Sequence, residues 1–269
     1  MKIIQSKNKL IKLIHNQKNL GFVPTMGAIH KGHLSLIKKS ISQCNKTIVS
    51  IYVNKPQFNQ KNDFKNYPRV LKKDISILKK TKIDYLYLPK DNQIYHKRQN
   101  KKIKIDSFSK KLCGKFRPGH FEAVVDVVNR FIQIINPTKI YLGKKDMQQL
   151  ILISNFIKEN KINVKVVGCK TIRERNGIAS SSRNNLLTLN EKKIASKIYK
   201  IIKENKRKLI INKLSIKSIK ESIQKLGINK IEYIKVFNIN SLLKSFEKKL
   251  EYKIFISYYL GETRLIDNI

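Results

Sequence analysis

The sequence predicts an α/β protein: a doubly wound parallel sheet followed by a smaller C-terminal α+β domain. Strand-like and helix-like segments alternate through the first two thirds of the 269 residues, which is the order that builds a parallel sheet. The pattern then changes to two lysine-rich helices and two alternating strands. Hydrophobic residues make up 41% of the chain, enough for a globular core.

Five short apolar runs are the predicted strands of the first domain. The clearest is 47–53, a continuous β-branched run typical of a strand buried on both faces. A proline at position 89 closes another run. The five predicted strands are 20–23, 47–53, 84–88, 139–142 and 163–167.

Helices are expected between these strands because their apolar residues recur at helical spacing. Val70, Ile75 and Leu78 mark a helix over 69–80, and Asn136-Pro137 ends a long helix over 121–135. One further helix is predicted to continue through 34–37, and another to cover 147–157.

After about residue 187 we expect helices over 191–208 and 215–226, then strands over 230–236 and 252–258. Both strands alternate in polarity, like antiparallel strands with one solvated face. The predicted organisation is a Rossmann-like domain, 1–187, and an α+β lid domain, 188–269. The cleft between them is the expected ligand site.

The formal charge of +40 comes almost entirely from lysines spread along the whole chain. They accompany abundant isoleucine and asparagine, a pattern of compositional bias, and there are only nine arginines. A phosphate-binding patch is typically clustered and richer in arginine. We therefore expect a solvated lysine surface with weak, salt-sensitive attraction to RNA and no specific nucleic-acid partner.

Nothing in the sequence predicts a membrane or secretory protein. No apolar run approaches the ~18 residues of a membrane span, and the first residues lack the apolar core of a signal peptide. Cys44, Cys113 and Cys169 are scattered, without paired metal spacing, as in a reduced cytoplasmic protein. His15 and His96 lie among lysines and are expected on the surface.

Residues 21–33 combine small residues with two histidines three positions apart, His30 and His33. Gly27 and Gly32 allow a tight turn and a close approach to a ligand. Histidines at i and i+3 share one helix face, and a helix amino end favours an anion. This loop is a candidate phosphate site.

Four further segments are polar enough to suggest chemistry, each with an ordinary structural alternative. Asn54 and Gln57 follow a buried strand, where open sheets bind ligands or where the chain simply exits the sheet. Arg117 and His120 flank a Pro-Gly turn, where the histidine either serves the site or caps the next helix.

The other two segments contain charged residues. Lys145 is placed to grip a phosphate, while Asp146 beside it fits an ordinary helix N-cap. Three serines before Arg183 form either an anion-binding run or a surface loop. No cysteine or serine has a readable nucleophile pattern, so activation by a nucleotide is the more economical chemistry.

Together these segments resemble the pantothenate synthetase family, the ATP-dependent pantoate–β-alanine ligases. The matching motifs occur in order along essentially the whole chain: 23–33, 50–54 with 57–58, 67–69, 117–121, 143 with 145–146 and 148–149, 181–184, and 260–261 with 264–268. A two-histidine loop alone is shared with many nucleotidyltransferases, whose product stays joined to the nucleotide. That class explains neither the glutamines nor the small C-terminal domain.

The resemblance implies a two-step reaction. The carboxylate of (R)-pantoate attacks the α-phosphate of ATP, and the amine of β-alanine then attacks the pantoyl adenylate to release pantothenate and AMP. It also implies a homodimer, and Mg²⁺ bound with the ATP phosphates, for which no protein ligand is predicted.

The resemblance also implies roles for individual residues. His33 is the expected proton donor to the departing pyrophosphate, Ile172 offers a backbone contact to adenine, and Gln57 and Gln149 hold the pantoate hydroxyls, with Gln57 also near β-alanine. The implied ATP-binding residues are Met26, Gly27, Ala28, Ile29, His30, Lys31, Gly32, His33, Gly143, Lys144, Lys145, Asp146, Ile172, Ser180, Ser181, Ser182 and Arg183.

The chain departs from the family pattern at a few positions. Lys144 stands where the family usually has an acidic residue, and Met147 where it has an aromatic one. Lys55-Pro56 replaces a Pro-Met pair, and Ala123 replaces a glycine. Lys144 changes the charge beside the nucleotide, so ATP affinity is the property expected to differ.

Overall fold

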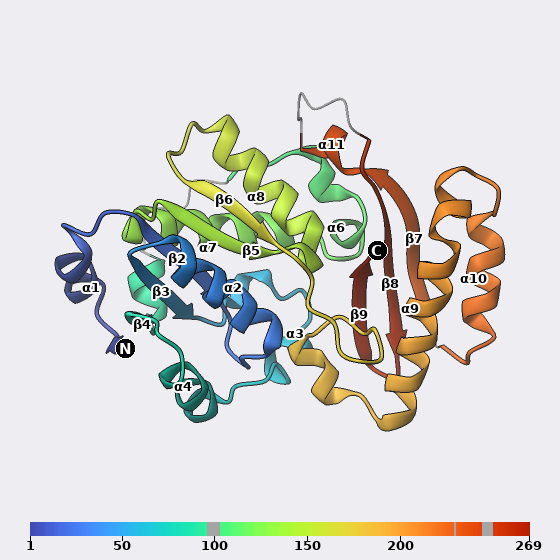
Figure 1. The fold of residues 1–269 in the computed structure, drawn as a ribbon, viewed down its shortest axis with the longest axis horizontal. Helices are drawn as coiled ribbons and strands as arrows, with labels where there is room; N and C mark the ends of the chain where they lie inside the picture. The colour runs from blue at the N-terminus through green and yellow to red at the C-terminus, as the bar shows by residue number, and fades with distance from the viewer. Residues whose placement is uncertain (96–102, 229, 244–249) are drawn as a thin grey trace.

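The computed structural model describes residues 1–95, 103–228, 230–243 and 250–269. It contains a six-stranded sheet and a separate three-stranded sheet, placed side by side (Figure 1). The fold class predicted from the sequence is confirmed. His96 lies outside the described residues, and His15 is exposed.

All neighbouring strands of the first sheet are parallel, in the order β1-β4-β3-β2-β5-β6. From β2 the chain builds outward through β3 and β4, and then returns to the other side of β2 with β5. The carboxyl ends of β2 and β5 therefore flank the switch point at which open α/β sheets bind ligands. The strands are β1 (Lys2–Ile4), β2 (Leu20–Thr25), β3 (Lys46–Ile51), β4 (Tyr85–Tyr87), β5 (Lys139–Gly143) and β6 (Lys165–Cys169).

Helices cover both faces of this sheet. On one face α2 and α4 pack against Val23, Val49 and Leu86, and on the other α1, α7 and α8 pack against Phe22, Ile48 and Ile140. The helices are α1 (Lys7–Ile14), α2 (Lys31–Gln43), α3 (Lys61–Lys65), α4 (Leu71–Lys79), α5 (Asp91–Ile94), α6 (Cys113–Phe116), α7 (His120–Ile135) and α8 (Met147–Glu159).

The second sheet is antiparallel, in the order β7-β8-β9. In Figure 1, α9 and α10 lie along its outer side, and a second core fills the space between them and the sheet. The elements are α9 (Leu189–Ile210), α10 (Ile216–Gln224), β7 (Lys230–Asn238), α11 (Ile239–Leu242), β8 (Tyr252–Leu260) and β9 (Thr263–Asn268). The domain boundary at 187 stays a prediction.

The predicted solvated face of this second sheet is wrong. Ile254 and Ile256 face the α9 and α10 core, but Phe255, between them, packs into the core of the first sheet. Phe237 meets Phe108 edge to face, with ring centroids 5.6 Å apart. Polar–apolar alternation indicates that a strand has two different faces, and here the second face is covered by the rest of the chain.

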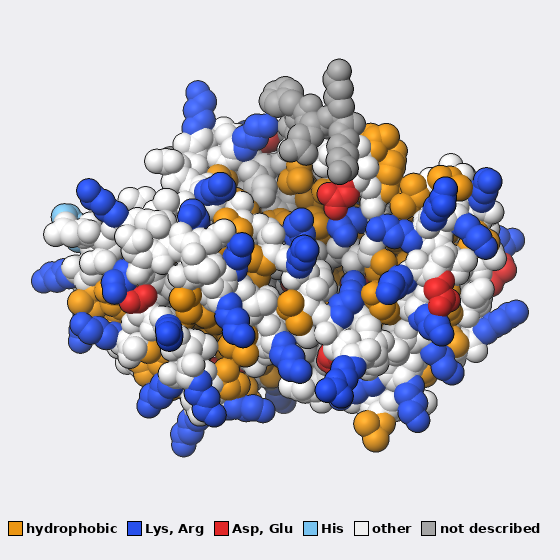
Figure 2. Space-filling view, in the orientation of Figure 1, with side chains coloured by type: hydrophobic (Ala, Val, Ile, Leu, Met, Phe, Trp, Pro, Cys, Tyr) orange, Lys and Arg blue, Asp and Glu red, His pale blue; other side chains and the backbone are white. Residues whose placement is uncertain are grey.

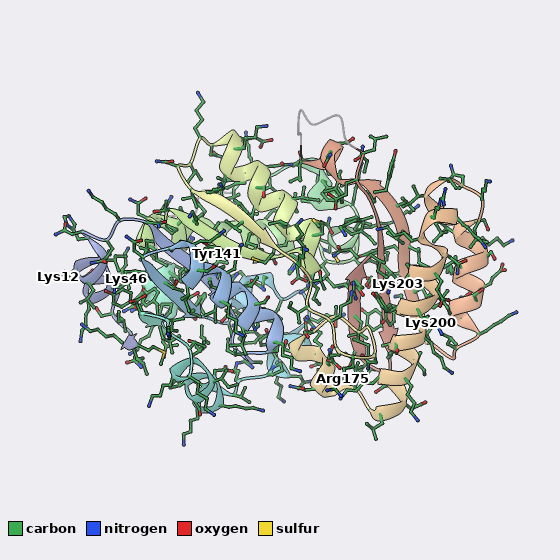
Figure 3. All side chains as sticks on the ribbon, in the orientation of Figure 1. Lys12, Lys46, Tyr141, Arg175, Lys200 and Lys203 are labelled. Atoms are coloured by element: carbon green, nitrogen blue, oxygen red, sulfur yellow. The ribbon has the colours of Figure 1, made fainter. Side chains whose placement is uncertain are left out.

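Lysine and arginine side chains are spread over the visible face of the molecule without gathering at one place (Figure 2). In Figure 3, Lys12 and Lys46 lie at the end formed by the first sheet, while Lys200 and Lys203 lie on α9 at the opposite end. This even spread fits the expectation of a solvated lysine surface. None of the helices in the described part of the chain has the length and apolarity of a membrane-crossing helix.

Candidate active site

A cavity of about 290 Å³ opens at the carboxyl ends of β2, β3 and β5. The second sheet contributes Tyr258, Arg264 and Asp267 to its lining. The cleft expected between the two parts of the chain is therefore present, at the switch point of the parallel sheet.

The two histidines lie at the start of α2, with ring centroids 4.0 Å apart. His30 Nδ1 accepts a hydrogen bond from the backbone N–H of Gly32 at 3.1 Å, and His33 Nδ1 accepts from the backbone N–H of His30 at 3.4 Å. Because each Nδ1 is an acceptor, each neutral ring carries its proton on Nε2. Both rings are therefore N–H donors with Nε2 free of the helix cap.

The surroundings keep both rings neutral. Burial lowers the pKa of His30 to about 4, and the charge of Lys145 acts in the same direction. Burial also lowers the pKa of His33 to about 3, with a further contribution from His30. A bound triphosphate would bring negative charge that favours protonation. The pair can therefore take up a proton when an anionic ligand binds.

The loop after β5 brings a cation and an anion to the same cavity. Lys145 Nζ lies 3.3 Å from Asp146 Oδ1, and both side chains line the cavity. Burial tends to raise the pKa of Asp146, but the charge and hydrogen bond of Lys145 hold it below its usual value. Asp146 stands at the N-cap position of α8 but pairs with Lys145 instead of capping the helix. The ordinary interpretation is thus correct about the N-cap position and wrong about the capping hydrogen bond.

Lys144 lies differently from its neighbour. It is not among the cavity-lining residues, and its side-chain carbons pack beside Gly168 of β6. Its backbone carbonyl accepts a hydrogen bond from the Asn268 side chain. Its side chain therefore forms no part of the cavity wall, and its implied contact with ATP stays a prediction.

The serine–arginine run forms another wall of the cavity. Ser181 Oγ accepts from the backbone N–H of Arg183, and this starts a short 3-10 helix over Ser182–Leu186. Arg183 is held by Asp63, at 3.1 Å, and the same carboxylate lies 3.7 Å from Arg117. Ile172 lines the cavity, and its carbonyl accepts from the backbone N–H of Ser180 at 2.8 Å.

Gln57 is fixed on the neighbouring wall through its backbone. Its carbonyl accepts from His120 Nδ1 at 2.7 Å and from Arg117 at 3.2 Å. Burial, followed by the charge of Arg117, lowers the pKa of His120 to about 3. Of the two interpretations of His120, serving the site or capping the next helix, these contacts favour the first. His120 is the first residue of α7 and holds Gln57 in place.

The side chains beside Gln57 complete an amide group at this wall. Asn54 Nδ2 donates to Gln57 Oε1 at 3.1 Å, and Tyr95 Oη donates to Asn54 Oδ1 at 2.7 Å. Gln149 lines the same cavity from α8. An apolar wall lies close by, formed by Val124, Val127, Val128, Phe131 and Leu142. The arrangement suits a small molecule that has both hydroxyl and branched apolar groups.

Most of the residues predicted from the sequence meet at this cavity. Those that line it are Met26, His30, Gly32, His33, Gln57, Gly143, Lys145, Asp146, Gln149, Ile172, Ser180, Ser181, Ser182 and Arg183. Gly27, Ala28, Ile29, Lys31 and Lys144 do not line it. Ala28 and Ile29 are buried, and Lys31 is exposed. The roles of all these residues stay predictions.

Sequence reasoning missed a buried ion pair in the wall made by the second sheet. Arg264 donates to Glu232 at 2.6 Å, and this contact, with hydrogen bonds from Ser257 and Tyr259, holds the pKa of Glu232 below its usual value against the opposing effect of burial. Cys113 Sγ lies 2.9 Å from Tyr233 Oη at the same place. The sequence did offer a signal for Arg264, because this residue lies in the family motif at 264–268, but no role was assigned to it.

Comparison with known proteins decides the family. The model of the family described as pantoate-beta-alanine ligase matches residues 2–269, almost the entire chain. The chain belongs to this family. The resemblance read from the ordered motifs is thereby confirmed.

Individual relatives agree over nearly full length. The chain is 40% identical to a pantothenate synthetase of Flavobacterium psychrophilum, over 98% of this chain and 95% of the relative. A pantoate-beta-alanine ligase structure from Francisella tularensis, complexed with beta-gamma ATP and beta-alanine, is 37% identical, with a TM-score of 0.87 over 100% of this chain and 97% of that one. A pantothenate synthetase structure from Thermus thermophilus has a TM-score of 0.87 at 28% identity, over 100% of this chain and 99% of that one.

Proposed function

We propose that this chain condenses (R)-pantoate with β-alanine at the expense of ATP, through a pantoyl-adenylate intermediate. The observation that carries the proposal is the convergence of two kinds of residue on one cavity. His30, His33, Lys145 and Arg183 suit a triphosphate, and Gln57 and Gln149 suit a hydroxy acid. A nucleotidyltransferase would need the first group and would leave the second without a role.

In the first step the pantoate carboxylate attacks the α-phosphate of ATP and pyrophosphate leaves. The amides of Gln57 and Gln149 donate to and accept from the pantoate hydroxyls, and the apolar wall over Val124 and Phe131 packs against its methyl groups. His33 donates from Nε2 to the pyrophosphate as charge builds there, with His30 beside it and Lys145 as a fixed positive charge. Catalysis thus rests on positioning and charge neutralisation.

In the second step the amine of β-alanine attacks the acyl carbon of the adenylate and AMP leaves. No protein nucleophile is required, in agreement with the absence of a readable nucleophile in the sequence. The second sheet forms one wall of the cavity, which would shield the mixed anhydride from water on that side. Gln57, whose backbone is held by His120, would lie near β-alanine in this step, as the family resemblance implies.

Mg²⁺ is proposed to enter with the ATP phosphates. Across the residues that the structure describes, no group of three or more His, Cys, Asp or Glu side chains could hold a metal ion alone. Mg²⁺ commonly uses phosphates, waters and one or two carboxylates, and Asp146 supplies one carboxylate at the cavity. The ion would neutralise part of the triphosphate charge. We further propose a homodimer, as the family resemblance implies, and a cytoplasmic location, as the scattered cysteines suggest.

The test is pyrophosphate release from ATP, measured with pantoate alone and with pantoate plus β-alanine. Pantoate-dependent release, with free AMP and pantothenate formed only when β-alanine is present, is the expected result. Folded protein that releases no pyrophosphate in response to pantoate would contradict the proposal. A product still joined to the nucleotide in the presence of β-alanine would favour the nucleotidyltransferase class.

A further inference from the structure

A buried carboxylate lies directly behind the two-histidine loop. Asp74, on α4, is only 1% exposed. Its Oδ2 accepts from the backbone N–H of Ala28 at 2.8 Å, and its Oδ1 accepts from the backbone N–H of Ile29 at 2.7 Å. Both carboxylate oxygens are therefore used by consecutive amides of the loop between β2 and α2.

The loop adopts an unfavourable backbone around this carboxylate. Ala28 has a φ of +49°, in the left-handed region that residues other than glycine rarely adopt. Gly27 precedes it with a φ of +84°, and a Cβ at Gly27 would lie 3.0 Å from Asp74 Oδ2. The two charge-assisted hydrogen bonds offset the cost of this conformation.

The same contacts decide which loop groups face the cavity. The amides of Ala28 and Ile29 point toward Asp74, and neither residue lines the cavity. Met26, just before this turn, and His30, just after it, both line the cavity, and His30 is the N-cap of α2. The orientation of both histidine rings thus depends on a turn that a side chain from another helix holds.

We propose that Asp74 is a positioning residue for ATP. It holds Gly27, Ala28 and Ile29 in the turn that aims His30 and His33 at the triphosphate, without touching the nucleotide itself. The kinetic part of this inference rests on the proposed ligase function, whereas the structural part does not.

Asp74→Asn is the direct test because it keeps the shape of the side chain but replaces one acceptor oxygen with an NH₂ donor. The matched control is Asp84→Asn. Asp84 accepts from the backbone N–H of Thr47 at 2.9 Å and from Lys46 Nζ at 2.8 Å, just before β4, at the end of the sheet away from the cavity. Both variants lose a carboxylate that binds backbone, and only one of these carboxylates holds the histidine loop.

Two readouts separate positioning from general stability. Amide hydrogen exchange of a peptide covering residues 24–33 should quicken in Asp74→Asn and stay unchanged in Asp84→Asn. The ligase assays are run at a temperature below the unfolding transitions of both variants. We then expect KM for ATP to rise about tenfold or more in Asp74→Asn, while KM for pantoate changes by less than about threefold.

Two outcomes would overturn the proposal: unchanged exchange over residues 24–33, or equal activity losses in the two variants without any change in KM for ATP. If Asp74→Asn does not fold, Asp74→Glu keeps the charge while its longer side chain displaces the loop, and the same two readouts apply. Exchange is measured without substrate, so failure of the ligase proposal would leave this arm intact.

Discussion

The side-chain amide of Asn268 donates to the backbone carbonyl of Lys145 at 2.7 Å. It also donates to the carbonyl of Lys144 at 2.9 Å, so the last residue of β9 holds the loop after β5 by two successive carbonyls. Asn268 is 3% exposed. The second sheet therefore fixes the position of a lysine that belongs to the first.

Asn268→Ala should weaken the use of ATP without removing it. Loss of the two hydrogen bonds costs about 1–2 kcal/mol of loop positioning, so we expect kcat/KM for ATP to fall about tenfold, by the conversion of 1.4 kcal/mol per factor of ten. The control is Asn160→Ala, an exposed amide that donates to the carbonyl of Phe156 at the end of α8. Equal kinetics in the two variants would contradict this role of Asn268.

His33→Ala should abolish adenylation while the protein stays folded. The ring is the expected donor to the departing pyrophosphate, and removal of one such donor commonly costs about 10²–10³ in kcat. Pantoate-dependent pyrophosphate release is the measurement, with circular dichroism to confirm the fold. His15→Ala, in which an exposed ring is lost from the end of α1, should release pyrophosphate normally. Near-normal turnover by His33→Ala would show that the assignment is wrong.

Lys144 and Lys145 form a natural pair for comparison because they are neighbours of equal charge with different surroundings. Lys145 lines the cavity and Lys144 does not. Lys145→Ala should raise KM for ATP at least about thirtyfold, since a fixed charge on a phosphate is lost. Lys144→Ala should change KM for ATP by less than about threefold, because the loss of a solvent-screened charge has only a small effect. Steady-state kinetics at two ionic strengths would measure KM for ATP in both variants. Equal changes in KM for ATP would contradict the different roles of the two lysines.

The parallel sheet was predictable because buried strands give continuous apolar runs that need no knowledge of their partners. Residues 47–53 and 139–142 correspond to β3 and β5 within two residues at each end. The run at 163–167 was placed two residues early, since β6 covers Lys165–Cys169 and ends in Gly168 and Cys169, which carry no strong strand signal. The short edge strand β1 was missed because three residues give no period.

The candidate site was predictable where a side chain follows a strand directly, as Lys145 does after β5. Asp74 was missed although a signal was present: it lies four residues before Leu78, on the buried face of the same helix. A carboxylate at a core position requires a partner, but the sequence does not say that the partner is a loop about 45 residues earlier. Contacts between distant segments, such as Asn268 with Lys145, share this limit.

Acid should destabilise this protein through histidines that are buried in their neutral form. His120 has a pKa of about 3 in the folded chain, against an ordinary value of 6.5, because of burial and the nearby Arg117. Between these two values the unfolded chain binds a proton that the folded chain does not. The free energy of unfolding therefore falls as pH drops below about 6.5, by up to about 1.4 kcal/mol per pH unit for one such group. His30 and His33 act in the same direction.

His120→Gln should flatten this dependence, because glutamine does not titrate and its amide can still donate to the Gln57 carbonyl. Chemical denaturation at about pH 7, 6 and 5 would measure the slope. We expect the variant to be less stable than the parent at neutral pH and to lose less stability on acidification, with His15→Gln following the parent curve. Parallel curves for the parent and His120→Gln would contradict a neutral, buried His120, and with it the hydrogen bond from Nδ1 that fixes Gln57 at the cavity.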